Sequence, residues 1–275
     1  NKTFGLEAST KNSEVIHSGV YYKNNSLKAK LCVQGKRLIY KFCKKYKIPN
    51  KKIQKLFIGN SKSDLKLIQQ MYKNAKINKV KDIKIIGKDL IKKIEPNIIA
   101  NYALLSKSSG IFDINGFMKK VFYLCKKNKV KFLFKRKISH GICNKNKFIF
   151  NNIKLNRFDY VINAAGLGAI KIANRTFKNK LFPSDRPLVG LYFQTKQNLG
   201  IKRIIYPAMK PKKNLERVDI TPSISGRYIF GPSVEKKGKI NTKKTKLKFD
   251  KFLNKVHLYL DKSKIKFFKK GVRPK

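Results

Sequence analysis

Residues 158–168 constrain the fold more than any other stretch of this sequence, because an apolar run there leads directly into small residues and two glycines. The run from Phe158 to Asn163 contains aromatic and β-branched residues and favours a strand. Ala164, Ala165 and Gly166 favour a tight turn in which backbone N–H groups can approach a ligand closely. We expect Gly166 to contact a ligand through this turn, with an ordinary strand-ending turn as the alternative.

Capping residues and periodic apolar residues predict several helices. Ser26 is a candidate N-cap for a helix that should end before Pro49, since a residue that precedes proline disfavours helical geometry. Asp113 is a candidate N-cap for a second helix that carries Leu124. Further helices are expected over residues 64–75, 89–94 and 246–260.

The strands expected from the sequence fall into two groups. Residues 55–59, 130–134 and 158–163 are apolar runs between helices, and a polar, hairpin-like region covers residues 144–152. From residue 186 onward, short strand-like pieces alternate with proline and glycine turns, which is typical of an antiparallel sheet. Those pieces cover residues 188–195, 203–206, 217–221 and 227–230.

The formal net charge of +53 would ordinarily indicate nucleic acid or an anionic membrane as a partner. Here the lysines are scattered through every segment, without an isolated basic tail or an aromatic RNA-binding motif. Such scattered charge gives only nonspecific, salt-sensitive affinity. We therefore do not expect nucleic acid to be the natural ligand, and a nonspecific polyanion-binding protein remains an alternative.

The chain of 275 residues can bury a substantial core, and from its apolar pattern we expect no transmembrane segment and no signal peptide. We expect a cytoplasmic protein, with peripheral association with an inner membrane as an open alternative. The four cysteines lack metal-ligand spacing, so we expect them to be reduced and expect no metal site. They are Cys32, Cys43, Cys125 and Cys143.

Several segments together carry a resemblance to a known family. The stretch from Asn12 to Tyr22, which contains His17, resembles the flavin-contacting segment of FAD-dependent 2-hydroxyacid oxidoreductases, in particular the L-2-hydroxyglutarate dehydrogenase/oxidase family of the D-amino-acid-oxidase-like superfamily. Other segments are similar to segments of that family and occur in the same order. They are Lys55–Ile58, Gly110–Asp113, Val161–Leu167, Ile205–Pro207, Phe230–Pro232 and Gly271–Lys275.

The resemblance implies an α/β fold with an α+β substrate part. An incomplete Rossmann-like FAD-binding domain would be interrupted by a substrate domain with an antiparallel sheet. The FAD-binding part would comprise residues 1–50, 106–178 and 271–275, and the substrate domain residues 51–105 and 179–270. The sequence lacks the G-x-G-x-x-G unit that binds the FAD pyrophosphate in such enzymes. We therefore expect a chain trimmed at both ends that is inactive alone.

The resemblance also implies site residues for oxidation of a small 2-hydroxy acid, similar to L-2-hydroxyglutarate, to the 2-oxo acid by hydride transfer to FAD. His17 would be the base, because an imidazole titrates near neutral pH. Arg273 would hold the substrate carboxylate through two parallel hydrogen bonds. Tyr22 and Tyr206 would orient the substrate, although each is equally consistent with an amphipathic core residue. Ser13, Gly19 and Gly166 would contact the cofactor.

Two departures from the family pattern keep the substrate open. Asp219 stands where the family has a histidine, and the segment Val189–Tyr192 lacks the lysine of the corresponding family segment. These changes remove a cation and an imidazole from a site expected to hold a dianion. A second alternative within the same superfamily is an amine or amino-acid oxidase, which the pattern from Asn12 to Tyr22 matches less well. The sequence does not identify the electron acceptor.

Overall fold

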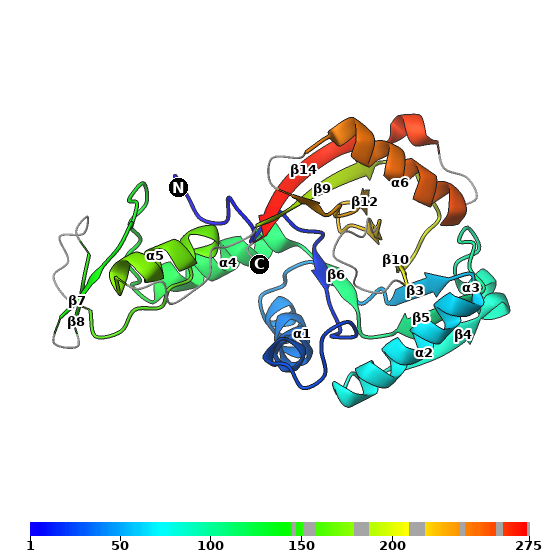
Figure 1. Cartoon of the computed structure of the whole chain (residues 1–275), viewed down its shortest axis with the longest axis horizontal. Coiled ribbons are helices and arrows are strands. Elements are labelled where there is room, and N and C mark those ends of the chain that lie inside the picture. The colour runs from blue at the N-terminus through cyan, green and yellow to red at the C-terminus, as the bar shows by residue number, and fades with distance from the viewer. Residues whose placement is uncertain are drawn as a thin grey trace.

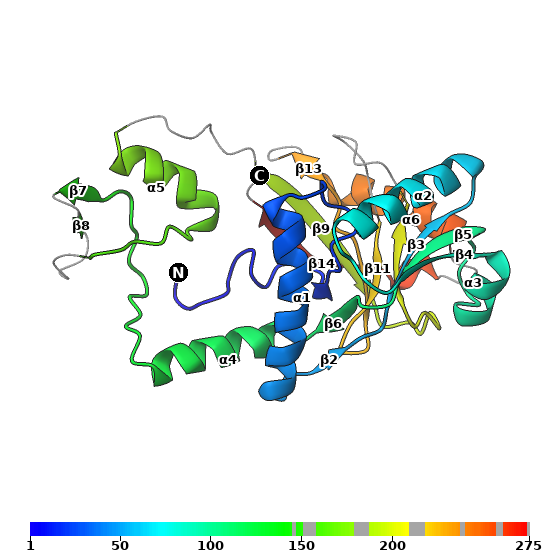
Figure 2. The same cartoon turned by 90° about the horizontal axis from the view of Figure 1, so that it is seen from below.

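The structure is a computed structural model that describes residues 1–144, 147–150, 158–178, 187–208, 218–236, 240–256 and 261–273. Figure 1 shows a strongly curved sheet flanked by helices, and a smaller lobe at the left that helix α4 (Ile114–Lys127) approaches. Figure 2, turned by 90°, shows helix α1 (Leu27–Lys45) standing between the lobe and the sheet.

The main sheet contains nine strands within the described part of the chain, in the order β13-β9-β12-β11-β10-β3-β5-β4, with β14 paired to β9. The pairing of β3 with β10 is parallel, and the other pairs are antiparallel. The sheet is thus mixed, whereas the sequence predicted only its antiparallel part. The strands are β3 (Lys55–Gly59), β4 (Ile83–Gly87), β5 (Tyr102–Ser106), β9 (Leu188–Thr195), β10 (Ile204–Pro207), β11 (Ile220–Pro222), β12 (Tyr228–Phe230), β13 (Glu235–Lys236) and β14 (Lys266–Arg273).

Helix boundaries follow local capping, and the predicted helices are confirmed. Ser26 accepts a hydrogen bond from the backbone N–H of Ala29 and begins α1. Asp113 caps α4 through two backbone N–H groups. Helix α2 (Lys62–Ile77) begins two residues before the expected Asp64, because Ser61 and Asp64 form a capping box. Helix α3 (Lys88–Ile94) also lies where it was expected.

The core lies on both faces of the main sheet, because side chains alternate along a strand. Leu56 and Ile58 of β3 face a cluster that includes Phe249 and Leu253 of helix α6 (Thr242–Val256). Phe57, between them, faces the opposite cluster, with Ile68 and Met71 of α2. Helices α2 and α6 therefore cover opposite faces of the sheet, as Figure 1 shows. The predicted extension of α6 to residue 260, with His257, lies outside the described residues.

A small antiparallel sheet positions the start of the chain. Its strands are β1 (Val15–Ile16), β6 (Gly110–Phe112) and β2 (Asn50–Lys51), in the order β1-β6-β2. Gly110–Phe112 is thus a strand, where the sequence indicated a turn. The prediction of a strand at residues 130–134 is wrong: these residues form no strand, and Phe132 and Phe134 pack against Phe122 of α4. Among the described residues, no strand lies beside residues 130–134 to pair with their backbone.

The smaller lobe contains a hairpin and a short helix. Strands β7 (Ile142–Asn144) and β8 (Lys147–Ile149) pair in the region expected to form a hairpin. A 3-10 turn η1 (Gly166–Gly168) then leads into α5 (Ala169–Thr176). No described helix of the molecule is both long and apolar enough to span a membrane.

The strand predicted at residues 158–163 is wrong. Only Phe158 forms a bridge, to Phe148, and the following residues join no ladder among the described strands. Tyr160 and Ile162 are each 91% exposed, and the backbone N–H of Ala164 donates locally to the carbonyl of Ile162. An apolar run forms a strand only when a neighbouring strand pairs with its backbone N–H and C=O groups. In this run, only Phe158 has such a neighbour.

Candidate active site

His17 lies just after β1, where the chain leaves the small sheet and turns toward α1. Ile16 pairs with Gly110 of β6, which fixes the position of the next residue. Gly19 then has φ +97, and a Cβ at that position would lie 3.1 Å from Cγ2 of Val33 in α1. Only glycine adopts this geometry without strain, so Gly19 has a conformational reason for its identity.

His17 faces a buried amine and an aromatic ring. The Nζ atom of Lys55 lies 3.4 Å from Nδ1 of His17 and 3.7 Å from the ring centroid of Tyr206. The His17 and Tyr206 ring centroids are 6.3 Å apart. Lys55 and Tyr206 are each 1% exposed. The structure therefore brings together two of the predicted site residues and adds a lysine that sequence reasoning did not select.

The strand register places these groups on one face. β3 and β10 run parallel, with Lys55 opposite Ile204 and Phe57 opposite Tyr206. Because alternate residues share a face, Lys55, Phe57 and Tyr206 all point away from Leu56 and toward the His17 segment. His17, Gly19 and Tyr22, together with Lys55 and Phe57, line one small pocket that the segment 17–22 completes.

The two tyrosines after Val20 face different neighbours. Tyr21 stacks on Tyr206 with ring centroids 6.4 Å apart, and its hydroxyl donates to the carbonyl of Pro207 at 3.4 Å. Tyr22, the residue predicted to orient the substrate, lies beside α1, where Nζ of Lys28 is 4.8 Å from its ring centroid. Tyr21, rather than the predicted Tyr22, therefore packs with the ring of Tyr206. No feature of the sequence distinguished Tyr21 from Tyr22.

The Cys32 thiol of α1 responds to the positive charge near this pocket. Burial raises the pKa of Cys32, while the charges of Lys55 and Lys36 lower it. The thiol also donates to the carbonyl oxygen of His17 at 3.5 Å. Burial lowers the pKa of Lys36, whose amine donates to the hydroxyl of Ser108 at 2.7 Å. Two amines on different elements therefore act on one thiol beside His17.

Ser13 and Arg273 are not among the residues that line the pocket beside His17. Ser13 is buried, and the segment that contains it runs along β14, where a Cβ on Gly271 would collide with the carbonyl oxygen of Lys11. Arg273 ends β14 and is exposed. Its charge lowers the pKa of Tyr192 in β9, while burial and buried Asp219 raise that pKa, to about 12. The described interactions of Arg273 thus involve β9 rather than His17.

Gly166 lies in the smaller lobe and is exposed. Its φ is +54, and no atom lies within 4 Å of the position that a Cβ would occupy. The following helix α5 has no side-chain cap and no acidic residue in its first turn. The backbone N–H groups of Gly168 and Ala169 donate to the carbonyls of Ala165 and Gly166, so the feature here that suits a ligand is the open space beside Gly166.

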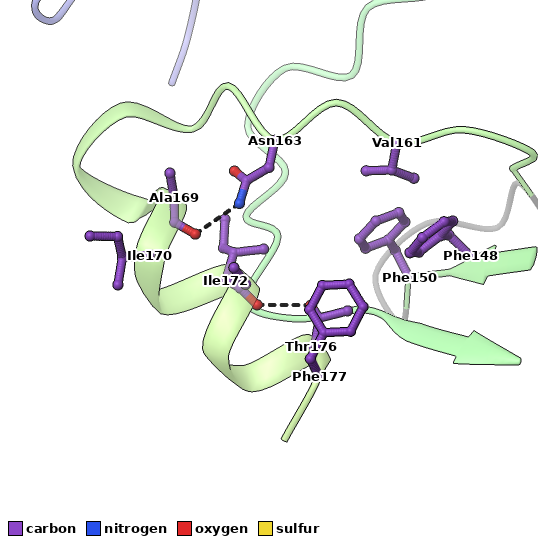
Figure 3. Close-up of a pocket in the computed structure, with 10 residues that line it drawn as sticks. Phe148, Phe150, Val161, Asn163, Ala169, Ile170, Ile172, Thr176 and Phe177 are labelled. Carbon is purple, nitrogen blue, oxygen red and sulfur yellow. Dashed lines mark hydrogen bonds between the residues drawn. The ribbon is translucent and has the colours of Figure 1, made fainter. Parts of the chain in front are cut away.

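A second hollow, of about 430 Å³, lies in the same lobe between α5 and the hairpin, as Figure 3 shows. Its walls are largely apolar, with Phe148, Phe150 and Phe177 prominent. The polar side chains of Asn163 and Thr176 donate to backbone carbonyls of α5. None of the described residues that line this hollow is a histidine, a lysine or a carboxylate, so the hollow offers no acid or base of its own.

Comparison with known proteins places the chain among flavoenzymes. A family model described as "FAD dependent oxidoreductase" matches residues 1–275. The chain is 30% identical over 272 residues to an L-2-hydroxyglutarate dehydrogenase of Arabidopsis thaliana, covering 85% of this chain and 55% of that protein. It is 28% identical over 231 residues to a glycerol 3-phosphate dehydrogenase of Caloramator mitchellensis, covering 82% and 47%. The chain spans about half the length of the curated relatives it matches.

Solved structures support the fold. The L-alpha-glycerophosphate oxidase of Mycoplasma pneumoniae superposes with a TM-score of 0.86 at 19% identity, covering 100% of this chain and 75% of that one. A glycine oxidase of Geobacillus kaustophilus gives a TM-score of 0.82 at 12% identity, covering 99% and 74%. The predicted α/β fold is confirmed, while the division into FAD-binding and substrate domains stays a prediction.

Proposed function

Because the chain belongs to the family of FAD-dependent oxidoreductases, we propose that it forms part of an enzyme that oxidises a small 2-hydroxy acid, similar to L-2-hydroxyglutarate, to the 2-oxo acid. The names of the curated relatives support this substrate class. The observation that carries the proposal is the placement of His17 beside Lys55 and Tyr206, because it gives a titratable imidazole a fixed, largely enclosed position.

The reaction removes a hydride from C2 and a proton from the hydroxyl group. FAD, when bound, supplies the acceptor for the hydride. His17 is the group in this pocket suited to accept the proton near neutral pH. Arg273 holds the substrate carboxylate, for which its planar guanidinium is suited. Tyr22 and Tyr206 are the proposed residues that orient the substrate, and the buried ring of Tyr206 presents its face to the amine of Lys55.

The residues present fit part of an FAD site. The open space around Gly166 leaves room for a phosphate of the cofactor to approach the backbone closely. Ser13 and Gly19 border the segment that carries His17, and they are the proposed contacts on the flavin side. The high positive charge of the chain favours the approach of anions, which include both FAD and a carboxylate substrate. The proposal includes a cytoplasmic location and leaves the electron acceptor open.

The test uses the natural protein that contains this chain, loaded with FAD and supplied with an artificial electron acceptor. L-2-hydroxyglutarate, L-lactate, glycerol 3-phosphate, glycine and L-proline are compared as substrates. We expect 2-oxo acid formation from a 2-hydroxy acid. His17→Gln should lower that rate by about 10²–10⁴-fold, the usual contribution of a positioned base.

His140→Gln provides a matched control, because His140 lies in the smaller lobe, where its Nδ1 meets the Ser139 hydroxyl at 2.9 Å. This variant should retain the wild-type rate. Turnover of glycine or L-proline instead of hydroxy acids would replace the proposal with the amino-acid oxidase alternative. A wild-type rate for His17→Gln would remove His17 as the base.

A further inference from the structure

Three buried serines connect the segment after β1 with the turn between β5 and β6. Ser18 follows His17, Ser106 ends β5, and Ser109 lies just before β6. Ser18 is 3% exposed, and Ser106 and Ser109 are both 0% exposed. The Oγ atom of Ser106 donates to Oγ of Ser18 at 2.9 Å and lies 3.1 Å from Oγ of Ser109. The three hydroxyls therefore form one continuous chain inside the protein.

The hydrogen bonds of this chain run in one direction. A serine hydroxyl carries a single proton, so it donates one hydrogen bond and accepts up to two. Since the proton of Ser106 goes to Ser18, the bond between Ser106 and Ser109 must be donated by Ser109. Ser18 stands at the accepting end of the chain, and its own proton is left over. Within the described part of the protein, that proton has no acceptor.

Backbone pairing holds the chain of hydroxyls in place. Ser106 lies opposite Lys55 in the antiparallel pairing of β5 with β3, so both side chains point to the same face of the main sheet. The carbonyl oxygen of Ser109 accepts from the backbone N–H of Gln54 at 2.9 Å. The two serines that orient Ser18 therefore sit on backbone that the strands already fix.

Ser18 lines the small pocket beside His17, and this is the space that its remaining proton can reach. The pocket has a volume of about 10 Å³, which is room for about one water-sized atom. A buried O–H group without an acceptor is costly, because it has lost water without gaining a partner. The pocket therefore suits a single acceptor oxygen.

The wall of the pocket also carries positive charge. Lys55 lines it together with Ser18, and the charge of Lys55 acts on the nearby thiol of Cys32. Hydrogen bonds to a charged acceptor are shorter and stronger than those to a neutral one. A hydroxyl donor and a cation in one wall thus favour an oxygen that bears negative charge.

We propose that Ser18 is a substrate-binding residue: its hydroxyl, oriented by Ser106 and Ser109, donates a hydrogen bond to a carboxylate oxygen of the hydroxy acid. This role rests on the proposed function. In a 2-hydroxy acid the hydroxyl and the carboxylate stand on neighbouring carbons, and His17 and Ser18 line the same pocket. A substrate whose hydroxyl meets His17 therefore brings its carboxylate close to Ser18. Arg273 does not line this pocket, so its proposed partner is a different carboxylate oxygen.

The first experiment measures the Kd of oxalate on the FAD-loaded natural protein by calorimetry. Oxalate carries oxygens on neighbouring carbons, as a 2-hydroxy acid does, but has no hydride to lose. We expect Ser18→Ala to raise the Kd by about 10- to 100-fold, because a hydrogen bond to a charged group is lost. Ser106→Ala should raise it by about 3- to 10-fold, since Ser18 keeps its proton but loses the bond that orients it.

Ser108→Ala is the matched control. Ser108 is buried in the same turn, but its hydroxyl accepts from Nζ of Lys36 and takes no part in the chain. The Kd of oxalate should be unchanged in this variant. Thermal unfolding of all variants shows that they are folded. A wild-type Kd for Ser106→Ala would overturn the orienting role of the chain.

The Kd of FAD, measured by fluorescence on the same variants, separates the sources of the oxygen. We expect it to stay at the wild-type value. A raised Kd of FAD with unchanged oxalate binding would assign the pocket to a flavin oxygen, and unchanged values for both ligands would assign it to a water. Either result overturns the proposal. Oxalate binding requires no turnover, so it tests Ser18 even if no 2-hydroxy acid is oxidised and the proposed function fails.

The second experiment measures kinetics with the 2-hydroxy acid. Ser18→Ala should raise KM by about 10- to 100-fold and change kcat only a few-fold, because the carboxylate is bound equally before and during hydride transfer. His17→Gln, by contrast, should act mainly on kcat. A lower kcat with an unchanged KM for Ser18→Ala would overturn the proposal.

Discussion

Nζ of Lys269 in β14 lies 3.9 Å from Oε1 of Glu14, and this pair connects the strand that ends at Arg273 with the segment that leads to His17. The amine also donates to the carbonyl of Thr10 at 3.5 Å. Burial raises the pKa of Glu14 and lowers that of Lys269, so desolvation outweighs the mutual attraction for both groups. The pair therefore fixes position more than it adds stability.

A double replacement tests this interpretation of the pair. Lys269→Met alone leaves the Glu14 carboxylate largely buried without its cation, and we expect a loss of about 1–3 kcal/mol in the free energy of unfolding. Lys269→Met combined with Glu14→Gln should recover most of that loss. Urea unfolding of the single and double variants measures the coupling. A double variant that is as unstable as the sum of the single variants would contradict it.

Glu95 should make stability depend on pH. It is fully buried, accepts hydrogen bonds from the backbone N–H of Lys202, and lies 3.3 Å from Arg203. Burial raises the pKa of Glu95, and the hydrogen bonds and the charge of Arg203 only partly offset this effect. A raised pKa gives stability that is complete below the unfolded value of about 4.5 and is lost as pH rises through the folded value.

Glu95→Gln removes this titration. As pH falls from 7 toward 5, the free energy of unfolding of the wild type should rise relative to that of the variant. Urea unfolding at several pH values measures the difference. Asp89→Asn, at an exposed carboxylate on α3, is the control and should show no comparable trend. A difference that is constant with pH would show that Glu95 has an ordinary pKa.

Gly19 should not tolerate a side chain. Its φ is +97 and a Cβ added there would lie only 3.1 Å from Val33, so Gly19→Ala combines backbone strain with a steric contact. We expect a loss of about 1–3 kcal/mol, because strained backbone positions cost this much. Gly35→Ala is the matched control within α1, where nothing lies within 4 Å of the added Cβ. Helix propensity should make that variant about 0.5–1 kcal/mol more stable. Thermal unfolding compares the two, and equal effects would contradict the explanation.

Polyanion binding should be weak and sensitive to salt. The charge of +53 will attract DNA or heparin at low ionic strength. Since the lysines are scattered, we expect the affinity to fall by roughly 10³–10⁵-fold between 50 and 200 mM salt. Fluorescence anisotropy with a labelled oligonucleotide, with and without FAD, measures this. Tight binding that survives 200 mM salt would favour the polyanion-binding alternative.

The sequence predicted what local residues determine. Ser26 and Asp113 begin their helices through bonds to residues two or three positions away, and such bonds can be read from a short stretch. The prediction of strands at the apolar runs 130–134 and 158–163 was wrong. A strand requires a neighbouring strand for its backbone hydrogen bonds, and the residues of the run do not show whether such a neighbour exists. His17 and Tyr206 were both selected, although their proximity depends on strand pairing between distant segments.

Lys55 was missed for a related reason. In a chain with 67 lysines and arginines, one more lysine at the start of an apolar strand carries little signal. The only indication in the sequence was its place at the head of the apolar run Leu56–Ile58, and the structure shows that every residue of Lys55–Gly59 is buried. The roles of Ser13, Gly19, Tyr22, Gly166 and Arg273 in a flavin site stay predictions.

The parallel pairing of β3 with β10 has a consequence for the order in which the protein matures. β3 and β10 are far apart along the sequence, so a ribosome must synthesise the whole stretch between them before the two can meet. Contacts between such distant segments form slowly. The nascent N-terminal part would hold the Lys55 amine in water until Tyr206 emerges, and the amine would lose its solvation only when the second half folds.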